Sequence, residues 1–265
     1  MSDDAIRLDV SGGVGRITMA RPEKHNAFDD GLIADLSAAF DAAGRDDAVR
    51  VVVLEGEGKS FSAGADLGWM QRMADYSDAE NLEDARKLAH MVRVLNELPR
   101  PTIARVQGAA FGGGVGLVAA CDIALASQAA SFCLSEAKLG LIPSVISPYV
   151  VEAIGARAAR RYFQTAERFD AETALALGLV HEVVPRERLD RRLDEVISIL
   201  LDNGPAAMAA SKDLIRRVAS GPVDDAMVED TAQRIADIRA TDEGREGVQA
   251  FLEKRGPKWQ TTTKA

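Results

Sequence analysis

The chain has 265 residues, a hydrophobic content of 47% and a formal net charge of −9. This length and composition are typical of one large domain, or of one domain with a smaller appendage, and supply ample apolar material for a core. The acidic balance argues against nonspecific binding to nucleic acid or to a membrane surface. No apolar run approaches the roughly 20 residues of a membrane span, and the acidic start resembles neither a signal nor a transit peptide. We therefore expect a cytoplasmic protein.

The first third of the chain predicts the order strand, strand, helix, strand. The expected elements are two hairpin strands (6–10 and 14–19), an amphipathic helix (30–43) and a buried strand (49–54). Asp29 is placed to cap the helix, and Gly44 is placed to end it.

Two glycine-containing stretches, residues 58–67 and 108–116, each follow an expected strand and lead into an expected helix. At such junctions the free N–H groups of the first helical turn point outward and favour negative charge. One N–H near Ala65 and one near Gly113 could together hold a single oxygen, as the stabilisation of a thioester enolate or tetrahedral oxyanion requires. Each stretch alone also fits an ordinary tight turn.

Neither glycine stretch matches a nucleotide-phosphate motif. The dinucleotide fingerprint fails because Leu117 stands where its third glycine belongs, and the P-loop pattern fails because Val53 replaces its leading glycine.

A carboxylate candidate follows in Ser135-Glu136, between an expected strand (131–134) and an apolar loop. In this position a carboxyl group can have a raised pKa and act as an acid or base, although a solvated glutamate or a helix cap fits the same pattern. Upstream, a capping box at residues 77–80 opens a helix expected to reach about Leu98.

The cysteines and histidines show no metal-ligand spacing. Cys121 and Cys133 lie inside apolar runs, which predicts buried free thiols in a reducing compartment. His25, His90 and His181 are scattered along the chain, so we expect no metal site.

Together these motifs resemble the crotonase (enoyl-CoA hydratase/isomerase) superfamily over nearly the whole chain. The stretches that carry the resemblance are residues 21–27, 61–67, 108–114, 121–123, 135–143, 174–184 and 250–255. The resemblance implies an α/β fold, with a spiral of repeated ββα units and an acyl-CoA site in residues 1–200. It also implies a helical trimerisation segment in residues 201–265, and a homotrimer or a dimer of trimers.

The resemblance also implies roles for individual residues. The backbone N–H groups of Ala65 and Gly113 would hold the thioester oxygen, and Glu136 would transfer protons. Coenzyme A would be part of the substrate, with no separate cofactor. The positions implied to contact it are Lys24, Ala27, Ala63, Asp66, Leu67 and Gly68, with Phe251 and Lys254 reaching its nucleotide end from a neighbouring subunit.

Two departures from the superfamily pattern bear on the reaction. Hydratases usually hold water between two glutamates, but Gly116 occupies the position of the first, leaving only Glu136. A single glutamate there is what the double-bond isomerases show. The loop 144–149 also departs, because it is usually rich in glycine and here reads Ser-Val-Ile-Ser-Pro-Tyr.

Residues 111–122, 141–151 and 159–169 are nevertheless similar to bacterial methylglutaconyl-CoA hydratases. The first expectation is therefore a hydratase of a branched glutaconyl-type CoA, such as 3-methylglutaconyl-CoA of leucine catabolism. A general 2-enoyl-CoA hydratase and an enoyl-CoA isomerase are the second and third. The acidic balance and the intact Ala65, Gly113 and Glu136 argue against a non-enzymatic binding role.

The last third predicts helices separated by proline and glycine. The expected helices are residues 156–166, 171–177, 189–201, 205–219 and 223–240. The cluster Arg157, Arg160 and Arg161 is expected to form a solvated helix face, and binding of an acidic acyl tail or a partner subunit is the alternative.

Overall fold

The computed structural model describes residues 5–219 and 221–260, whose strands form two sheets. The larger sheet has the order β1-β2-β3-β5-β7-β10, and the smaller has the order β4-β6-β8-β9. The strands are β1 (Ile6–Ser11), β2 (Val14–Met19), β3 (Val51–Gly56), β4 (Ser60–Ala63), β5 (Thr102–Val106), β6 (Ala109–Phe111), β7 (Ile123–Ser127), β8 (Ser131–Cys133), β9 (Phe169–Asp170) and β10 (Glu182–Val184).

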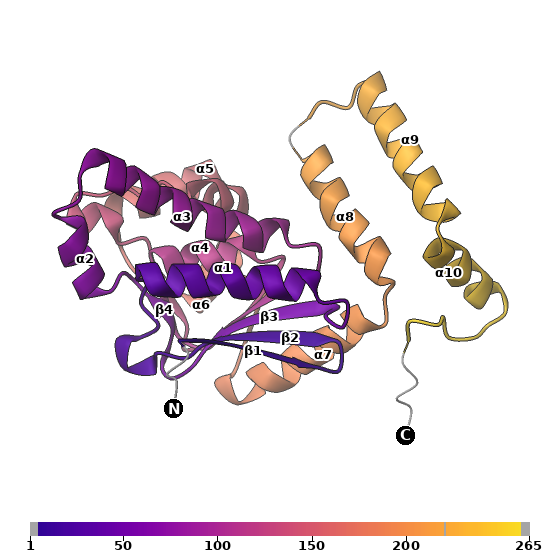
Figure 1. The fold of residues 1–265 in the computed structure, drawn as a ribbon, viewed down its shortest axis with the longest axis horizontal. Helices are drawn as coiled ribbons and strands as arrows, with labels where there is room; N and C mark the ends of the chain where they lie inside the picture. The colour runs from indigo at the N-terminus through magenta and orange to yellow at the C-terminus, as the bar shows by residue number, and fades with distance from the viewer. Residues whose placement is uncertain (1–4, 220, 261–265) are drawn as a thin grey trace.

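Helices follow or cover these strands (Figure 1). The α-helices are α1 (Asp30–Arg45), α2 (Leu67–Met73), α3 (Asp78–Glu97), α4 (Gly113–Ala120), α5 (Ser147–Thr165), α6 (Ala171–Leu177), α7 (Leu189–Leu201), α8 (Pro205–Val218), α9 (Asp225–Ala240) and α10 (Asp242–Leu252). Short 3₁₀ helices are η1 (Pro22–Lys24), η2 (Glu136–Leu139) and η3 (Arg186–Arg188).

One ββα unit recurs along the chain. In the pairs β3–β4, β5–β6 and β7–β8, the first strand joins the larger sheet and the second joins the smaller one, with parallel pairing between successive units. Helices α2 and α3, α4, and η2 with α5 follow the three pairs. This arrangement confirms the predicted α/β spiral of ββα units.

Both faces of the central strand β3 of the larger sheet are buried. Val52 and Leu54 of β3 belong to the main core, which includes side chains of α1 and α3, whereas Val51 and Val53 belong to a second cluster with α7. Figure 1 shows α1 and α3 on one side of this sheet and α7 on the other. Because successive side chains of a strand point to opposite faces, a strand covered on both sides is apolar throughout.

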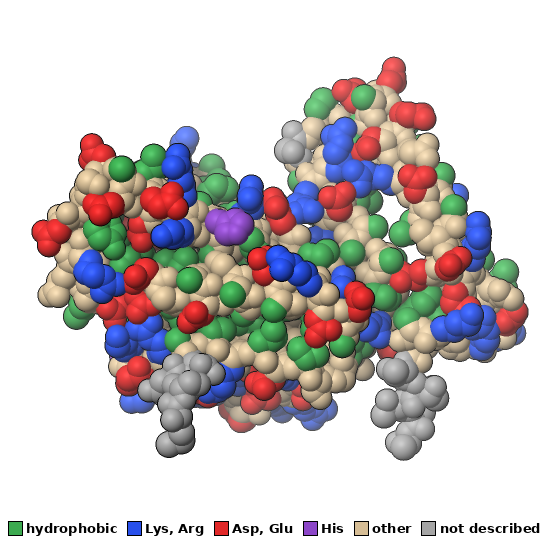
Figure 2. All heavy atoms as spheres, in the orientation of Figure 1, with side chains coloured by type: hydrophobic (Ala, Val, Ile, Leu, Met, Phe, Trp, Pro, Cys, Tyr) green, Lys and Arg blue, Asp and Glu red, His purple; other side chains and the backbone are tan. Residues whose placement is uncertain are grey.

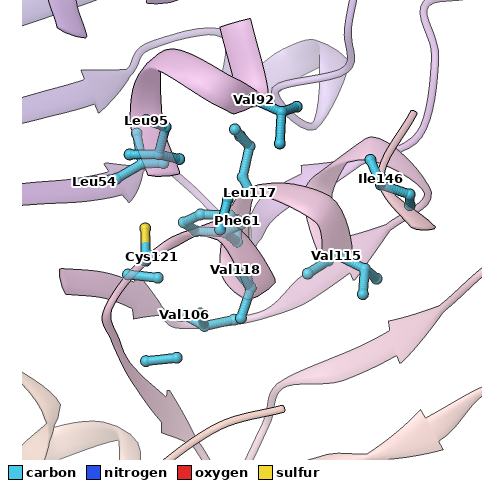
Figure 3. Close-up of a cluster of buried hydrophobic side chains, with 14 of the residues drawn as sticks. Leu54, Phe61, Val92, Leu95, Val106, Val115, Leu117, Val118, Cys121 and Ile146 are labelled. Atoms are coloured by element: carbon cyan, nitrogen blue, oxygen red, sulfur yellow. The ribbon is translucent and has the colours of Figure 1, made fainter. Parts of the chain in front are cut away.

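Helix α4 is the centre of the main core. Its side chains Val115, Leu117 and Val118 are buried together with Phe61 and Leu95, as Figure 3 shows. A helix that is apolar on every side must be covered on every side, here by β4, β6, α3 and α5. The start of α4 is therefore held rigidly between the two sheets and the helical layer.

Helices α8–α10 stand apart from this core in Figure 1, and Figure 2 shows the separation as a notch in the surface. Two sets of polar contacts connect them to the core. Lys212 of α8 donates to Asp122 at 2.8 Å, and Asp122 also accepts from the backbone and side chain of Thr102. After α10, the carbonyl of Trp259 accepts from Arg50 at 2.9 Å, and its indole N–H donates to the carbonyl of Asp202.

Several boundaries differ from those expected. Helix α1 continues through Gly44 to Arg45, so this glycine does not end the helix. A Cβ at Gly44 would lie only 3.1 Å from Leu98, so the glycine permits close packing there. The stretch 108–116 contains the strand β6. Helix α5 begins at Ser147, earlier than expected, and contains a break at Gly155. The short strands β4, β9 and β10 were not predicted, and α10 was expected only as part of the helical segment 201–265.

Cys121 and Cys133 are buried and free, as predicted. Burial raises the pKa of the Cys121 thiol to about 12. Among the described residues, no helix is both long enough and apolar enough to span a bilayer.

Candidate active site

A cavity of about 330 Å³ opens between two groups of elements. Helices α2 and α3 line one side, and the β6–α4 turn, η2 and the loop after η2 line the other. Ala65, Gly113 and Glu136 all border this cavity, so the structure brings these three predicted residues together.

The two glycine junctions meet at Phe28. Phe28 forms a parallel bridge with Ala65, and its ring would lie 2.9 Å from a Cβ at Gly113. A Cβ at Gly114 would overlap the carbonyl oxygen of Ser62 in β4. Only glycines allow the first turn of α4 to approach β4 and Phe28 this closely.

The N–H groups of Ala65 and Gly113 are available as donors. Within residues 5–219 and 221–260, neither group donates a hydrogen bond, although the adjoining N–H groups of Gly64, Asp66 and Gly112 all do. Gly113 is the first residue of α4, where a backbone N–H has no partner inside the helix. The cavity is therefore bordered by two free backbone donors from different strand-to-helix junctions.

Asn26 holds one of these junctions in place. It is fully buried, its backbone is left-handed (φ 53°), and its side-chain amide donates to the carbonyls of Glu57, Ser60 and Phe61 at 3.0–3.1 Å. The hydroxyl of Ser62 donates to the carbonyl of Asn26 at 2.8 Å. The polar loop 21–28 is thus fixed against β4, which positions Phe28 and Ala65.

Glu136 begins η2 directly after β8 and borders the cavity. Its Oε1 lies 3.3 Å from the position of a Cβ at Gly112, so this glycine leaves room for the carboxyl group. Its Oε2 is buried and accepts no hydrogen bond from the described residues. Burial raises the pKa of Glu136, which favours a group that can both accept and donate a proton.

No three His, Cys, Asp or Glu side chains of the described chain are grouped as the ligands of a metal ion would be. The charged side chains that border the cavity are both acidic, Asp84 and Glu136.

Residues 9–262 match the family model for enoyl-CoA hydratase/isomerase. The chain belongs to this family. Membership makes the protein an enzyme of the enoyl-CoA hydratase/isomerase type, with an acyl-CoA thioester as the class of substrate.

Relatives within the family are named as both hydratases and isomerases. The crystal structure of an enoyl-CoA hydratase from Shewanella pealeana is 46% identical, with a TM-score of 0.94, and the match covers 96% of each chain. An enoyl-CoA hydratase of Alternaria alternata is 36% identical over 80% of this chain and 70% of its own length. A trans-2-decenoyl-[acyl-carrier-protein] isomerase of Streptococcus mutans is 31% identical over 96% of this chain and 97% of its own length.

Gly116 and the altered loop 144–149 prove to be in direct contact. A Cβ at Gly116 would overlap Cγ2 of Ile146 and lie 2.7 Å from its Cβ. Ile146 is 3% exposed and lies beside α4, as Figure 3 shows. The position at which the sequence departs from the two-glutamate pattern is therefore packed against an isoleucine of the altered loop.

The residues expected to contact coenzyme A fall in two separate places. Lys24 forms an ion pair with Asp66 (Nζ to Oδ2, 3.2 Å), and Asp66 caps α2 by accepting from the N–H groups of Gly68 and Trp69. Ala27 and Ala63 lie on the neighbouring loop and strand, and Leu67 is 77% exposed at the start of α2.

Phe251 and Lys254 lie at the end of α10, which Figure 1 places on the opposite side of the molecule from α2. They do not border the cavity of their own chain.

Trp69, Asn81 and Asp84 also border the cavity, although no motif in the sequence marks them. The helices that carry them were predicted, but nothing in the local sequence shows that these particular side chains turn toward Glu136. The capping box at Ser77 fixes the start of α3 and so the register of Asn81 and Asp84, which is the one signal that pointed toward them.

Proposed function

We propose that this enzyme hydrates and dehydrates a branched glutaconyl-type enoyl-CoA, for which 3-methylglutaconyl-CoA is the model substrate. The observation that carries the proposal is a single buried carboxyl group, Glu136, that shares one cavity with two free backbone N–H groups. Those donors belong to Ala65 and Gly113, and they would bind the thioester oxygen. Such donors contribute roughly 3–4 kcal/mol each to a developing oxyanion.

The reaction adds water across the double bond next to the thioester. Glu136, in its ionised form, takes a proton from the attacking water while the hydroxyl adds to the β-carbon. The electron pair of the double bond moves toward the thioester oxygen, which Ala65 and Gly113 hold as an enolate. The protonated Glu136 then donates its proton to the α-carbon, and dehydration follows the same steps in reverse.

Ile146 is the reason to favour a substrate that carries its own carboxylate. The apolar side chain occupies the space beside Gly116, so this wall offers no second group to orient the water. In 3-methylglutaconyl-CoA the distal carboxylate is separated from the β-carbon by one methylene group. One of its oxygens can therefore accept a hydrogen bond from the attacking water.

Reaction in water labelled with heavy oxygen tests this proposal. We expect label in the product from 3-methylglutaconyl-CoA, and faster turnover of this substrate than of crotonyl-CoA. Label from crotonyl-CoA alone would support a general 2-enoyl-CoA hydratase instead.

Isomerisation of an enoyl-CoA double bond is the second candidate, because one carboxyl group beside an apolar wall suffices to move a proton between two carbons. The expected signature is a shift of the double bond in a 3-enoyl-CoA with no label from water. That outcome, with no hydration of either substrate, would replace the proposed hydratase with an isomerase.

We further propose that the enzyme is a homotrimer, or a dimer of trimers, in which Phe251 and Lys254 contact coenzyme A bound to a neighbour. Phe251 is 82% exposed, and α9 and α10 expose further apolar side chains, among them Val228, Ile235, Val248 and Leu252. On the side of its own chain, coenzyme A would lie along Lys24, Ala27, Ala63, Asp66, Leu67 and Gly68. A fully active monomer at micromolar concentration in light scattering would contradict this assembly.

A further inference from the structure

The wall formed by α2 and α3 carries polar groups that take no part in the proposed proton transfer by Glu136. Trp69 is 5% exposed, and its indole Nε1 is buried and makes no hydrogen bond of normal geometry with the described residues. Asp84 and Asn81 border the same cavity from α3, one turn of the helix apart. A buried donor without a hydrogen bond of normal geometry is costly, and the acceptor beside it is Asp84, so this pair is a candidate for recognition of a polar ligand group.

Asp84 lies beside the Trp69 indole in a partly desolvated position. Burial raises the pKa of Asp84, and the nearby Trp69 N–H acts in the opposite direction. The other charges that act on Asp84 are Asp30 of α1, Arg72 of α2 and Lys87 of α3, and Glu136 borders the cavity from η2. Among the described residues, no lysine or arginine borders the cavity.

We propose that Trp69 and Asp84, with Asn81 beside them, bind the carboxyl group at the far end of the acyl chain, and that Asp84 does so in its protonated form. This inference rests on the proposed function insofar as it takes a carboxylated acyl-CoA as the ligand. It adds the residues that select this ligand over an acyl chain that ends in a methyl group.

The chemistry follows from the hydrogen-bonding capacity of a protonated carboxyl group. Its carbonyl oxygen can accept from the Trp69 N–H, and its hydroxyl can donate to the carboxylate of the ligand. An ionised Asp84 would instead repel that carboxylate, because two like charges in close contact favour protonation of one of them. Binding therefore takes up one proton from solvent.

Two unreactive ligands of equal chain length test this inference directly. Glutaryl-CoA ends in a carboxylate and pentanoyl-CoA ends in a methyl group. We expect calorimetry in two buffers of different ionisation enthalpy to show uptake of about one proton for glutaryl-CoA and none for pentanoyl-CoA. Glutaryl-CoA should also bind up to about tenfold more weakly for each unit by which the pH exceeds the pKa of free Asp84.

The substitution Asp84→Asn keeps the shape of the side chain and supplies a permanent N–H donor. We expect it to abolish the proton uptake and to make glutaryl-CoA binding independent of pH. The matched control is Glu83→Gln, which removes a solvent-exposed carboxylate from the adjacent position of α3. Proton uptake that persists in Asp84→Asn would assign it to another group, such as Glu136, and would overturn the proposal.

The substitution Trp69→Phe removes the indole N–H and keeps an aromatic ring. Because the Trp69 N–H holds the carbonyl oxygen of Asp84, its loss should let the Asp84 hydroxyl turn away from the ligand. We expect the affinity for glutaryl-CoA relative to pentanoyl-CoA to fall about two- to tenfold, which is typical for loss of a neutral hydrogen bond. The control is Trp259→Phe, because the indole of Trp259 donates to Asp202 beyond the end of α7. An unchanged relative affinity in Trp69→Phe would remove Trp69 from the recognition site.

These binding measurements do not depend on turnover. Selective, proton-linked binding of glutaryl-CoA without hydration of 3-methylglutaconyl-CoA would refute the proposed function and leave this inference intact. Hydration of that substrate without proton-linked binding would do the reverse.

Discussion

Two walls beside the proposed reaction site differ in how their buried space is filled. On one wall the Oε2 atom of Glu136 is buried without a hydrogen-bond partner, an arrangement that costs folding free energy. On the other wall Gly116 and Ile146 fill the equivalent space with close apolar packing. In the proposed reaction, the destabilising buried carboxyl group is the one that transfers the proton, whereas apolar packing fills the position of a second one.

The largest effect is expected from Glu136→Gln. The amide keeps the size of the side chain but cannot transfer a proton, so turnover of any accepted enoyl-CoA should fall by about 100- to 10,000-fold. Steady-state kinetics on the best substrate from an acyl-CoA panel measures this loss. Turnover within tenfold of the wild type would show that Glu136 does not transfer the proton and that another acid carries the reaction.

The next largest effect is expected at Gly113, the first residue of α4. Gly113→Pro deletes the backbone N–H at the start of α4, where proline is tolerated by the helix, and turnover should drop about 100-fold.

The matched variant is Gly113→Ala, because it crowds the Phe28 ring in the same way but keeps the N–H. Circular dichroism establishes that both variants fold. Equal losses of turnover in Gly113→Pro and Gly113→Ala would attribute the effect to Phe28 and not to a missing donor.

Substitutions at Gly116 and Ile146 should have coupled effects on the free energy of unfolding. Gly116→Ala is expected to destabilise the protein by about 1–3 kcal/mol, because its Cβ overlaps Ile146. Ile146→Ala should also destabilise it, through loss of buried apolar contacts.

The double variant should lose at least about 1 kcal/mol less than the sum of the two single losses. Urea unfolding of the four proteins of this cycle measures the difference. Strict additivity would mean that the two side chains do not compete for the same space.

The smallest expected effect is on thermal stability, and it has a defined dependence on pH. Burial raises the pKa of Glu136 in the folded protein above that in the unfolded chain. Below the unfolded value the carboxyl group is protonated in both states, and the stabilisation this gives is lost as the pH rises through the folded value.

Glu136→Gln should therefore melt higher than the wild type at pH 8, by about 2–4 °C for each kcal/mol relieved, and the gain should shrink toward pH 4. Scanning calorimetry across this range measures it. A constant difference at all pH values would show that packing, and not ionisation, causes the effect.

Local signals in the sequence predicted much of the fold, because they act within a few residues. Asp29 and Ser77 cap the helices that they were expected to cap, and the resemblance to the superfamily supplied the repeated ββα order. Gly44 was misread because its neighbour in space, Leu98, lies more than 50 residues away along the chain.

The site residues divide in the same way, into those marked by local motifs and those brought together by tertiary contacts. The motifs placed Ala65, Gly113 and Glu136 in advance, and all three border one cavity. The contact between Gly116 and Ile146 joins residues 30 positions apart, and the wall of Trp69 and Asp84 depends on how two helices pack. Such tertiary contacts leave no periodicity or spacing that a single sequence would reveal.

The hydrogen bonds of Trp259 to Arg50 and to the carbonyl of Asp202 make the C-terminal helices a closed loop of chain and not a free tail. Lys212 fastens the beginning of this loop to Asp122, and Trp259 fastens its end. A protease that cuts the chain between α8 and α9 should therefore yield two fragments that co-migrate under native conditions.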